Sequence, residues 1–201
     1  MLVMAEAVKS KERAVASRTR SIAFTGLTIA IMAVSAWVTV PLGPVPFTLQ
    51  IFAFAFAILV LQPKECLAAV IGYLILGAVG VPVFSGMRGG IGVLAGPTGG
   101  FLWGYLLGAA AALAVLIVLR RRFGTEEPRS GAKGLAVDVV AALVFVAVSY
   151  VCGWAQYMAV AGVGPEAAFA TTIAPFVIVD VVKTVAAALC ARAVRVAVPR
   201  R

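Results

Sequence analysis

The sequence is 201 residues long; 63% of its residues are hydrophobic, only 12% are charged, and the mean hydropathy is +1.07. This composition excludes an ordinary soluble domain and predicts one polytopic membrane domain with lipid around it. The formal charge of +9 is typical of the basic loops of membrane proteins, so nucleic acid is not expected as a partner.

Histidine is absent, and the three cysteines are scattered along the chain. A disulfide framework, a metal site and a serine or cysteine nucleophile with a histidine base are therefore not expected. The phosphate-binding Gly-Lys-Ser/Thr ending is also missing, so ATP hydrolysis would have to come from a partner. We expect no cofactor.

Turn residues divide the apolar sequence into six segments that we expect to be transmembrane helices, because lipid offers no partner for open backbone groups. The segments cover residues 21–40, 47–61, 66–81, 98–119, 135–160 and 175–196. The sequence thus predicts an all-α polytopic membrane protein whose second helix is short.

The amino end is polar and of mixed charge, without the apolar core and cleavage site of a signal peptide. We expect a basic cytoplasmic tail over residues 1–20, a single six-helix domain over 21–198 and a short cytoplasmic tail over 199–201.

Lysine and arginine are distributed unevenly along this pattern. With both ends placed inside, 15 of the 17 fall on the cytoplasmic side, as in most membrane proteins. We therefore expect a multi-pass protein of the bacterial cytoplasmic membrane with both termini in the cytoplasm. The two exceptions are Arg88, in the outer loop (residues 84–100), and Lys183, inside the last helix.

Asp180 and Lys183 interrupt that last apolar segment. They are three residues apart and share one helical face, and a charge at mid-bilayer costs about 2.5 to 3.5 kcal/mol. This cost favours a cavity in which the two groups meet a ligand, the alternative being a structural ion pair. With the helix starting outside at residue 175, Asp180 would lie about 7 to 8 Å below its outer end, so the pocket would open outward.

The outer loop is rich in glycine, with seven between residues 86 and 100. Glycine permits tight turns and close approach to a ligand, so the loop is either a compact linker or a lid over the pocket. Arg88, Gly89 and Gly90 are its candidate ligand-binding residues, because an arginine fork suits a carboxylate.

Four further residues are candidates for the pocket wall. Gln50 could offer both a donor and an acceptor, or could satisfy freed backbone. Trp103, Tyr150 and Trp154 could line the apolar part of the pocket, although such residues near helix ends are commonly interfacial anchors.

The first helix carries small residues at Ala23, Gly26 and Ala30. Small residues in this spacing let a second helix approach closely in lipid, so they are a candidate docking ridge. Asp138, near the start of the fifth helix, is interpreted as a helix-start cap.

Four motifs resemble those of the BioY family, the biotin-specific substrate-capture subunits of energy-coupling factor vitamin transporters. They are VPFTLQ at residues 45–50, GVPVFSG at 80–86, GPTGG at 96–100 and DVVK at 180–183. The resemblance spans nearly the whole chain, and it implies a six-helix subunit that binds biotin from outside. It also implies partnership with a transmembrane coupling subunit and two ATP-binding cassette subunits.

The resemblance further implies a role for each site residue. Asp180 would accept hydrogen bonds from the ureido nitrogens of biotin, with Lys183 as a donor beside it. Some relatives carry an asparagine where this chain has Arg88 and an arginine where it has Leu102. Arg88 would then supply from the loop the positive charge that those relatives supply from the fourth helix.

Two other functions remain open from the sequence. A self-sufficient secondary transporter of biotin or a related small carboxylate would use Asp180 as a coupling site, although no inverted repeat is visible. A small membrane enzyme would use Asp180 and Lys183 as acid and base.

Overall fold

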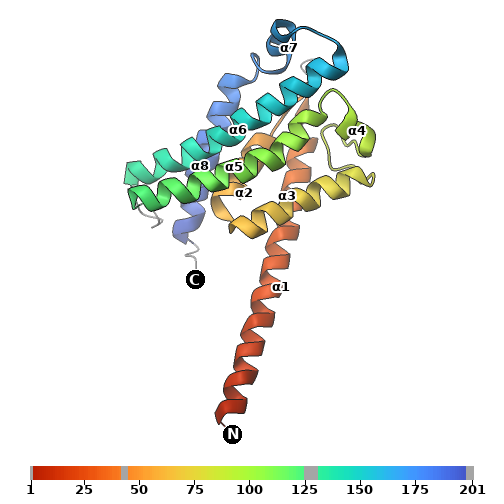
Figure 1. Cartoon of the computed structure of the whole chain (residues 1–201). Helices are drawn as coiled ribbons and strands as arrows, with labels where there is room; N and C mark the ends of the chain where they lie inside the picture. The colour runs from red at the N-terminus through yellow and green to blue at the C-terminus, as the bar shows by residue number, and fades with distance from the viewer. Residues whose placement is uncertain (1, 42–44, 125–130, 198–201) are drawn as a thin grey trace.

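The computed structural model describes residues 2–41, 45–124 and 131–197. Among these residues it contains eight α-helices and a two-stranded hairpin (Figure 1). In chain order the elements are α1 Leu2–Trp37, β1 Thr39–Val40, β2 Phe47–Thr48, α2 Gln50–Val60, α3 Pro63–Ala78, α4 Ile91–Ala95, α5 Gly99–Phe123, α6 Gly131–Ala161, α7 Pro165–Thr172 and α8 Val177–Ala197.

The six helices expected from the sequence correspond to α1, α2, α3, α5, α6 and α8, whereas the short α4 and α7 were not predicted. The predicted start of the first helix was wrong. Helix α1 begins at Leu2 instead of residue 21, and its N-terminal half extends away from the bundle (Figure 1). The expected tail at residues 199–201 lies outside the described residues.

The assumption that the chain contains only helices was also wrong. Strands β1 and β2 pair antiparallel, with Thr39 opposite Thr48 and Val40 opposite Phe47. Pro41 directly follows β1 and Pro46 directly precedes β2. Proline disfavours helix both at its own position and at the preceding one. Because Phe47 and Thr48 belong to the strand, α2 begins at Gln50 instead of residue 47.

Three described helices are long and apolar enough to cross a bilayer: the Arg18–Trp37 part of α1, α5 and α6. Helices α7 and α8 together form a fourth candidate span that is bent by 48° at a short break. Helix α2 has only 11 residues, eight of which are buried, so neighbouring helices surround it. Six complete spans are therefore not evident from helix length alone.

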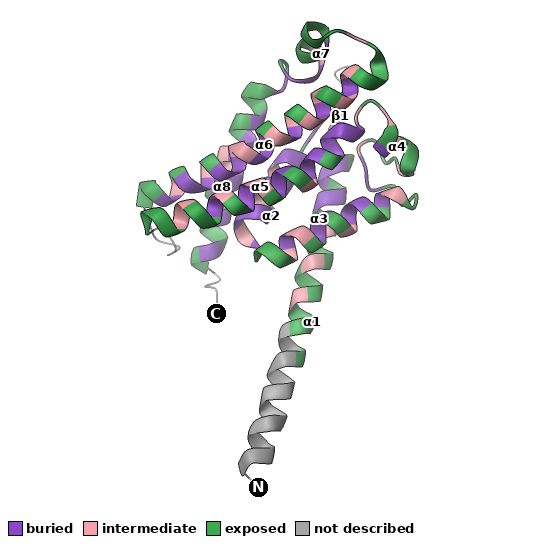
Figure 2. Cartoon of the chain, in the orientation of Figure 1, coloured by how far each residue is buried: buried purple, intermediate pink, exposed green. Residues whose placement is uncertain are grey.

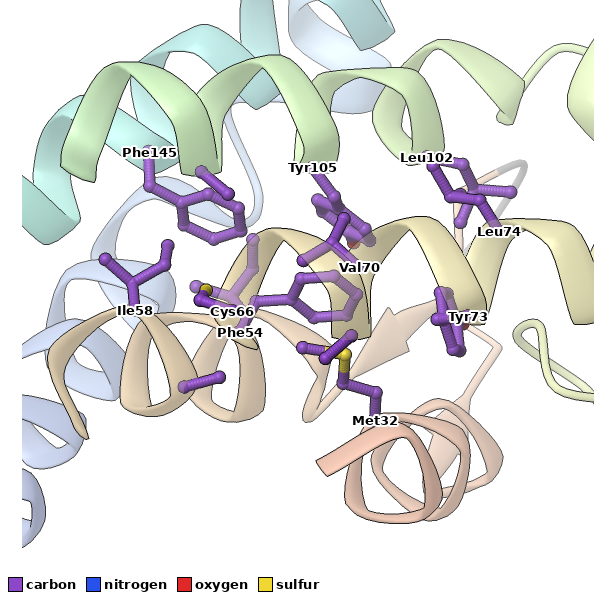
Figure 3. Close-up of a cluster of buried hydrophobic side chains, with 14 of the residues drawn as sticks. Met32, Phe54, Ile58, Cys66, Val70, Tyr73, Leu74, Leu102, Tyr105 and Phe145 are labelled. Atoms are coloured by element: carbon purple, nitrogen blue, oxygen red, sulfur yellow. The ribbon is translucent and has the colours of Figure 1, made fainter. Parts of the chain in front are cut away.

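The core forms around one face of α2, where aromatic rings meet side chains from α3, α5 and α6 (Figure 3). The Phe54 ring lies 4.5 Å from that of Tyr105 and 5.5 Å from that of Tyr73, between ring centroids. Figure 2 shows the buried positions of these helices turned toward one another and the exposed ones turned outward. The core thus holds α2 in place, and the pocket lies at the N-terminal end of α2.

Helices α5 and α6 pack closely because of glycines spaced four residues apart at Gly100, Gly104 and Gly108. A Cβ atom on Gly104 would lie 2.7 Å from the Cα of Ser149, and the Ser149 hydroxyl donates to the Gly104 carbonyl at 3.2 Å. Small residues permit this approach in membrane helices. The contact fixes the register between α5 and α6, and both helices contribute to the pocket wall.

Asp138 does not cap a helix start, so that interpretation was wrong. Helix α6 begins at Gly131, and Asp138 is buried inside it, between two arginines from other helices. Arg120 of α5 donates to its carboxylate at 2.9 Å, and Arg195 of α8 pairs with the other carboxylate oxygen. This cluster ties together the ends of α5, α6 and α8 that lie away from the pocket.

Candidate ligand-binding site

The site is built where the chain breaks between α7 and α8. Helix α8 begins at Val177, two residues later than predicted, so Asp180 lies in its first turn. At about 1.5 Å per residue, Asp180 is only about 4.5 Å from the helix start, instead of the predicted distance of about 7 to 8 Å. The start of a helix carries partial positive charge and favours a carboxylate, so the backbone itself helps to hold the negative charge.

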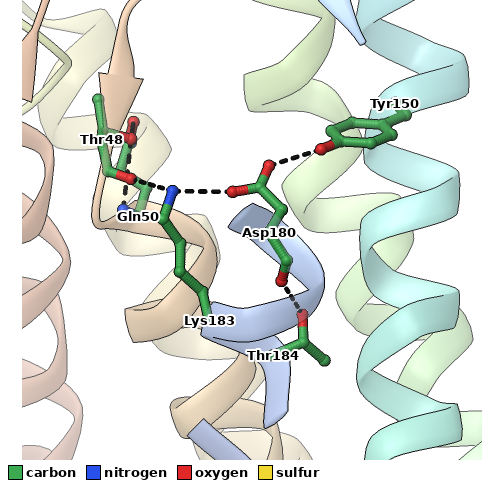
Figure 4. Close-up of polar contacts among 6 residues, drawn as sticks. All are labelled: Thr48, Gln50, Tyr150, Asp180, Lys183 and Thr184. Atoms are coloured by element: carbon green, nitrogen blue, oxygen red, sulfur yellow. Dashed lines mark hydrogen bonds and ion pairs between the residues drawn. The ribbon is translucent and has the colours of Figure 1, made fainter. Parts of the chain in front are cut away.

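Asp180 and Lys183 lie at the centre of a polar network (Figure 4). The Lys183 ammonium donates to Asp180 Oδ1 at 2.8 Å and to the backbone carbonyl of Thr48 at 2.7 Å. It also lies 3.7 Å from the centroid of the Phe47 ring. The Tyr150 hydroxyl donates to Asp180 Oδ2 at 2.6 Å. The network joins α6, α8 and the end of the hairpin.

This geometry leaves Asp180 with unused hydrogen-bonding capacity. Each carboxylate oxygen has two acceptor positions, and each accepts one of the bonds above. The ammonium of Lys183, in contrast, is already occupied by the carboxylate, a carbonyl and a ring face. The side chains of Lys183 and Asp180 are only 9% and 6% exposed, and breaking such a buried pair costs about 3 to 5 kcal/mol. A ligand that donates to Asp180 without displacing Lys183 therefore fits best.

A pocket surrounds this network. Its wall is mostly apolar and aromatic with a few polar groups, as is typical of small-molecule sites. The lining residues are Val45, Pro46, Phe47, Thr48, Gln50, Ile51, Phe84, Ser85, Arg88, Val93, Thr98, Phe101, Leu102, Tyr105, Tyr150, Thr172, Phe176, Asp180 and Lys183. Five of the nine predicted ligand-binding residues are among them: Asp180, Lys183, Arg88, Gln50 and Tyr150.

Gly89 and Gly90 do not line the pocket; they lie at the base of the outer loop. The Gly90 amide donates to the Gly77 carbonyl at 2.6 Å. A Cβ atom on Gly89 would collide with the backbone of Gly80 and Val81. The two glycines let the loop return closely against the end of α3.

Trp103 and Trp154 also lie outside the pocket lining. Each indole donates to a backbone carbonyl, Trp103 to Leu94 at 3.3 Å and Trp154 to Pro165 at 3.1 Å. Both rings thus anchor connecting segments, one at the end of α4 and the other at the start of α7.

Arg88 reaches the pocket from a small turn of the outer loop. Its backbone pairs with that of Phe84 through two hydrogen bonds, at 2.9 and 3.3 Å, and its Nε donates to the Ser85 carbonyl at 3.2 Å. Leu102 lines the same pocket from α5. The two positions compared in the sequence analysis therefore lie on one cavity.

Sequence reasoning missed several wall residues, among them Phe47, Thr48, Tyr105 and Phe176. Phe47 and Thr48 lie within the 45–50 motif that already included Gln50, so the motif was the available signal. Tyr105 and Phe176 had none, because their approach to Asp180 depends on how α5 and the α7–α8 break are placed.

The candidate docking ridge lies on the outer surface of α1. Ala23, Gly26 and Ala30 are all exposed, and a Cβ atom on Gly26 would meet no heavy atom within 4 Å. Within the described part of the chain, this stripe is free to contact another helix.

An apolar helical bundle with a buried charge pair in a largely apolar pocket is the architecture of a membrane-embedded small-molecule-binding protein. A model of the BioY family matches residues 6–200. The chain belongs to the BioY family.

Curated relatives match most of the chain. The biotin transporter BioY of Thermotoga maritima is 40% identical over 86% of this chain and 94% of its own length. That of Rhizobium etli is 36% identical over 90% and 96%, and the probable biotin transporter of Pyrococcus horikoshii is 34% identical over 87% and 95%. A crystal structure of the S-component for biotin from an ECF-type ABC transporter has a TM-score of 0.78 at 20% identity, covering 89% of this chain and 92% of that one. It shows the same fold.

Proposed function

We propose that this chain captures biotin at the outer face of the cytoplasmic membrane and delivers it inward as the S component of an energy-coupling factor transporter. The observation that carries the proposal is the buried Asp180–Lys183 pair in a mostly apolar pocket of a BioY-family chain. Biotin would be the cargo, with no cofactor, and the chain would act as a transport protein instead of an enzyme.

The pocket suits each part of biotin. The ureido ring offers two N–H donors, and Asp180 retains two acceptor positions after its bonds to Lys183 and Tyr150. The rings of Phe101 and Tyr105 supply apolar wall for the rest of the molecule. For roughly 16 heavy atoms, about −0.75 kcal/mol each gives about −12 kcal/mol, which corresponds to nanomolar binding.

Arg88 would bind the terminal carboxylate of biotin. An arginine fork matches a carboxylate with two parallel bonds, and Arg88 lines the pocket from the outer loop. Since Leu102 lines the same cavity, the loop arginine replaces the positive charge that some relatives carry at that α5 position. The outer loop would thus close over the ligand and supply its charged contact.

Energy would come from partners, namely a transmembrane coupling subunit and two ATP-binding cassette subunits. The sequence contains no phosphate-binding Gly-Lys-Ser/Thr ending, and the candidate docking ridge of Ala23, Gly26 and Ala30 is exposed on α1. Small residues on a lipid-facing stripe suit close contact with another membrane helix.

We propose six membrane passes, made by α1, α2, α3, α5, α6 and the bent α7–α8 pair. An even number of passes places both termini on one side, and the basic residues assign that side to the cytoplasm. The short α2 is accommodated because its neighbours bury it.

Titration calorimetry with biotin tests the proposal. The unmodified chain should bind tightly in detergent, and Asp180→Asn should lose about 2 kcal/mol or more of binding free energy, since a hydrogen bond to a charged group is lost. Arg88→Ala should also weaken binding at low salt.

Glu166→Gln is the matched control. It makes the same change in an exposed carboxylate of α7 that does not line the pocket, and it should bind like the parent. If the folded parent failed to bind biotin, the capture function would be wrong. If Arg88→Ala bound biotin as well as the parent, the compensation by Arg88 would be wrong.

A further inference from the structure

Tyr73 connects the pocket to the outer loop without lining the pocket itself. It lies on α3 and its side chain is fully buried. Its hydroxyl is 2.8 Å from Gln50 Nε2 and 2.9 Å from the backbone carbonyl of Val83. A buried tyrosine needs a partner for its hydroxyl, and this one has two, on different elements.

The chemistry of these groups fixes the direction of each hydrogen bond. The Val83 carbonyl can only accept, and the Tyr73 hydroxyl has a single proton, which it must donate there. The hydroxyl oxygen then accepts from Gln50, so the amide nitrogen of Gln50 faces Tyr73. Gln50 Oε1 is consequently turned toward Thr48, whose hydroxyl donates to it at 3.2 Å.

This orientation matters because Gln50 and Thr48 both line the pocket. The backbone carbonyl of the same Thr48 accepts a hydrogen bond from Lys183. A carbonyl at the edge of the outer loop thus determines, through Tyr73, which end of the Gln50 amide lies beside the charged network. Reversing the amide would place a donor beside Thr48, where Gln50 Oε1 now accepts a hydrogen bond.

The loop itself has other attachments and does not depend on this hydroxyl. The Trp37 indole donates to the Pro82 carbonyl at 2.7 Å, and the Gly90 amide donates to Gly77 at 2.6 Å. Phe84 packs edge-on against the Tyr73 ring at 5.5 Å, a contact that phenylalanine at position 73 would keep. Loss of the hydroxyl should therefore act mainly on Gln50.

We propose that Tyr73 is a positioning residue for the ligand: by accepting from the Gln50 amide while donating to the Val83 carbonyl, it fixes the orientation of Gln50 in the pocket. The inference rests on the proposed capture of biotin. It adds a specificity-determining residue that makes no ligand contact of its own.

A double-mutant cycle with biotin tests it by calorimetry. Tyr73→Phe should weaken binding about tenfold, the effect of one net hydrogen bond. In a Gln50→Leu background the same change should weaken binding less than twofold, because no amide remains to be oriented. Tyr157→Phe, a change at another buried tyrosine, on α6 and outside the pocket lining, should bind like the parent.

Equal losses in both backgrounds, or no loss in Tyr73→Phe, would overturn the inference. Gln50→Met replaces Gln50→Leu if the latter does not yield folded protein. Thermal unfolding without ligand separates this result from a failure of the proposed function. It is measured for the parent, Tyr73→Phe, Gln50→Leu and the double variant. The shifts in unfolding midpoint should be non-additive even if biotin does not bind. Additive shifts would mean that Tyr73 and Gln50 are not coupled.

Discussion

At the scale of single residues, two buried aspartates serve opposite purposes. Asp138 is held by two guanidinium groups, Arg120 and Arg195, each of which can offer a planar pair of donors. Asp180 has one ammonium and one hydroxyl and lines a pocket. Each carboxylate accepts two hydrogen bonds, but Asp138 faces two positive charges away from the pocket, whereas Asp180 faces one and lies where a ligand can reach it.

Asp138→Asn should therefore destabilise the protein without a specific effect on the pocket. Removing the carboxylate charge leaves Arg120 and Arg195 without their counter-charge in a mostly buried position, a loss of about 3 to 5 kcal/mol in comparable buried pairs. Thermal unfolding in detergent should show a clearly lower midpoint, while the folded fraction still binds biotin. Arg121→Gln, at an exposed neighbour of Arg120, is the control, and a midpoint equal to that of the control would contradict this role.

At the scale of elements, the sequence predicted what depends on local hydrophobicity. The long apolar segments of α5 and α6 and the shared helical face of Asp180 and Lys183 follow from composition and helical spacing, and both are confirmed. The β1–β2 hairpin, the short α7 and the link from Tyr73 to Gln50 were not predicted. Polar and proline-containing stretches look like plain connections in a sequence, and contacts between distant residues depend on tertiary packing.

The exposed ridge of α1 makes a prediction that belongs to the element as a whole. Leucines at Gly26 and Ala30 would fill the stripe that another helix needs for close approach. Since a Cβ on Gly26 would meet no heavy atom of the described residues within 4 Å, biotin binding should stay within about twofold of the parent by calorimetry. Uptake of labelled biotin by cells that also produce the coupling and ATPase subunits should be lost.

Ala136→Leu is the matched control for these leucines, because it makes the same kind of change at an exposed position of α6. Normal uptake by the α1 variant would exclude the ridge as a docking surface. Loss of biotin binding would make it an internal packing face.

At the scale of the whole molecule, the pocket and the cluster of Asp138, Arg120 and Arg195 occupy opposite ends of the same helices. Along α8, Asp180 and Arg195 are separated by about 22 Å, and along α6, Tyr150 and Asp138 by about 18 Å, at about 1.5 Å per residue. These separations account for most of a hydrocarbon core of about 30 Å. Arg120, Arg121 and Arg122 end α5 at the basic end. The arrangement favours a pocket that opens outward.

Cysteine labelling of intact cells tests that orientation. In a chain whose three native cysteines are replaced by alanine, Glu166→Cys places a thiol on α7, beside the pocket, and Arg121→Cys places one at the basic end of α5. Both native residues are exposed, so each new thiol is accessible from its own side. A membrane-impermeant maleimide should label Glu166→Cys in intact cells and Arg121→Cys only after permeabilisation, which also controls for thiol reactivity. The reverse pattern would place the pocket on the cytoplasmic side and contradict capture from outside. It would also mean that the charge asymmetry that orients the helices had been assigned to the wrong face.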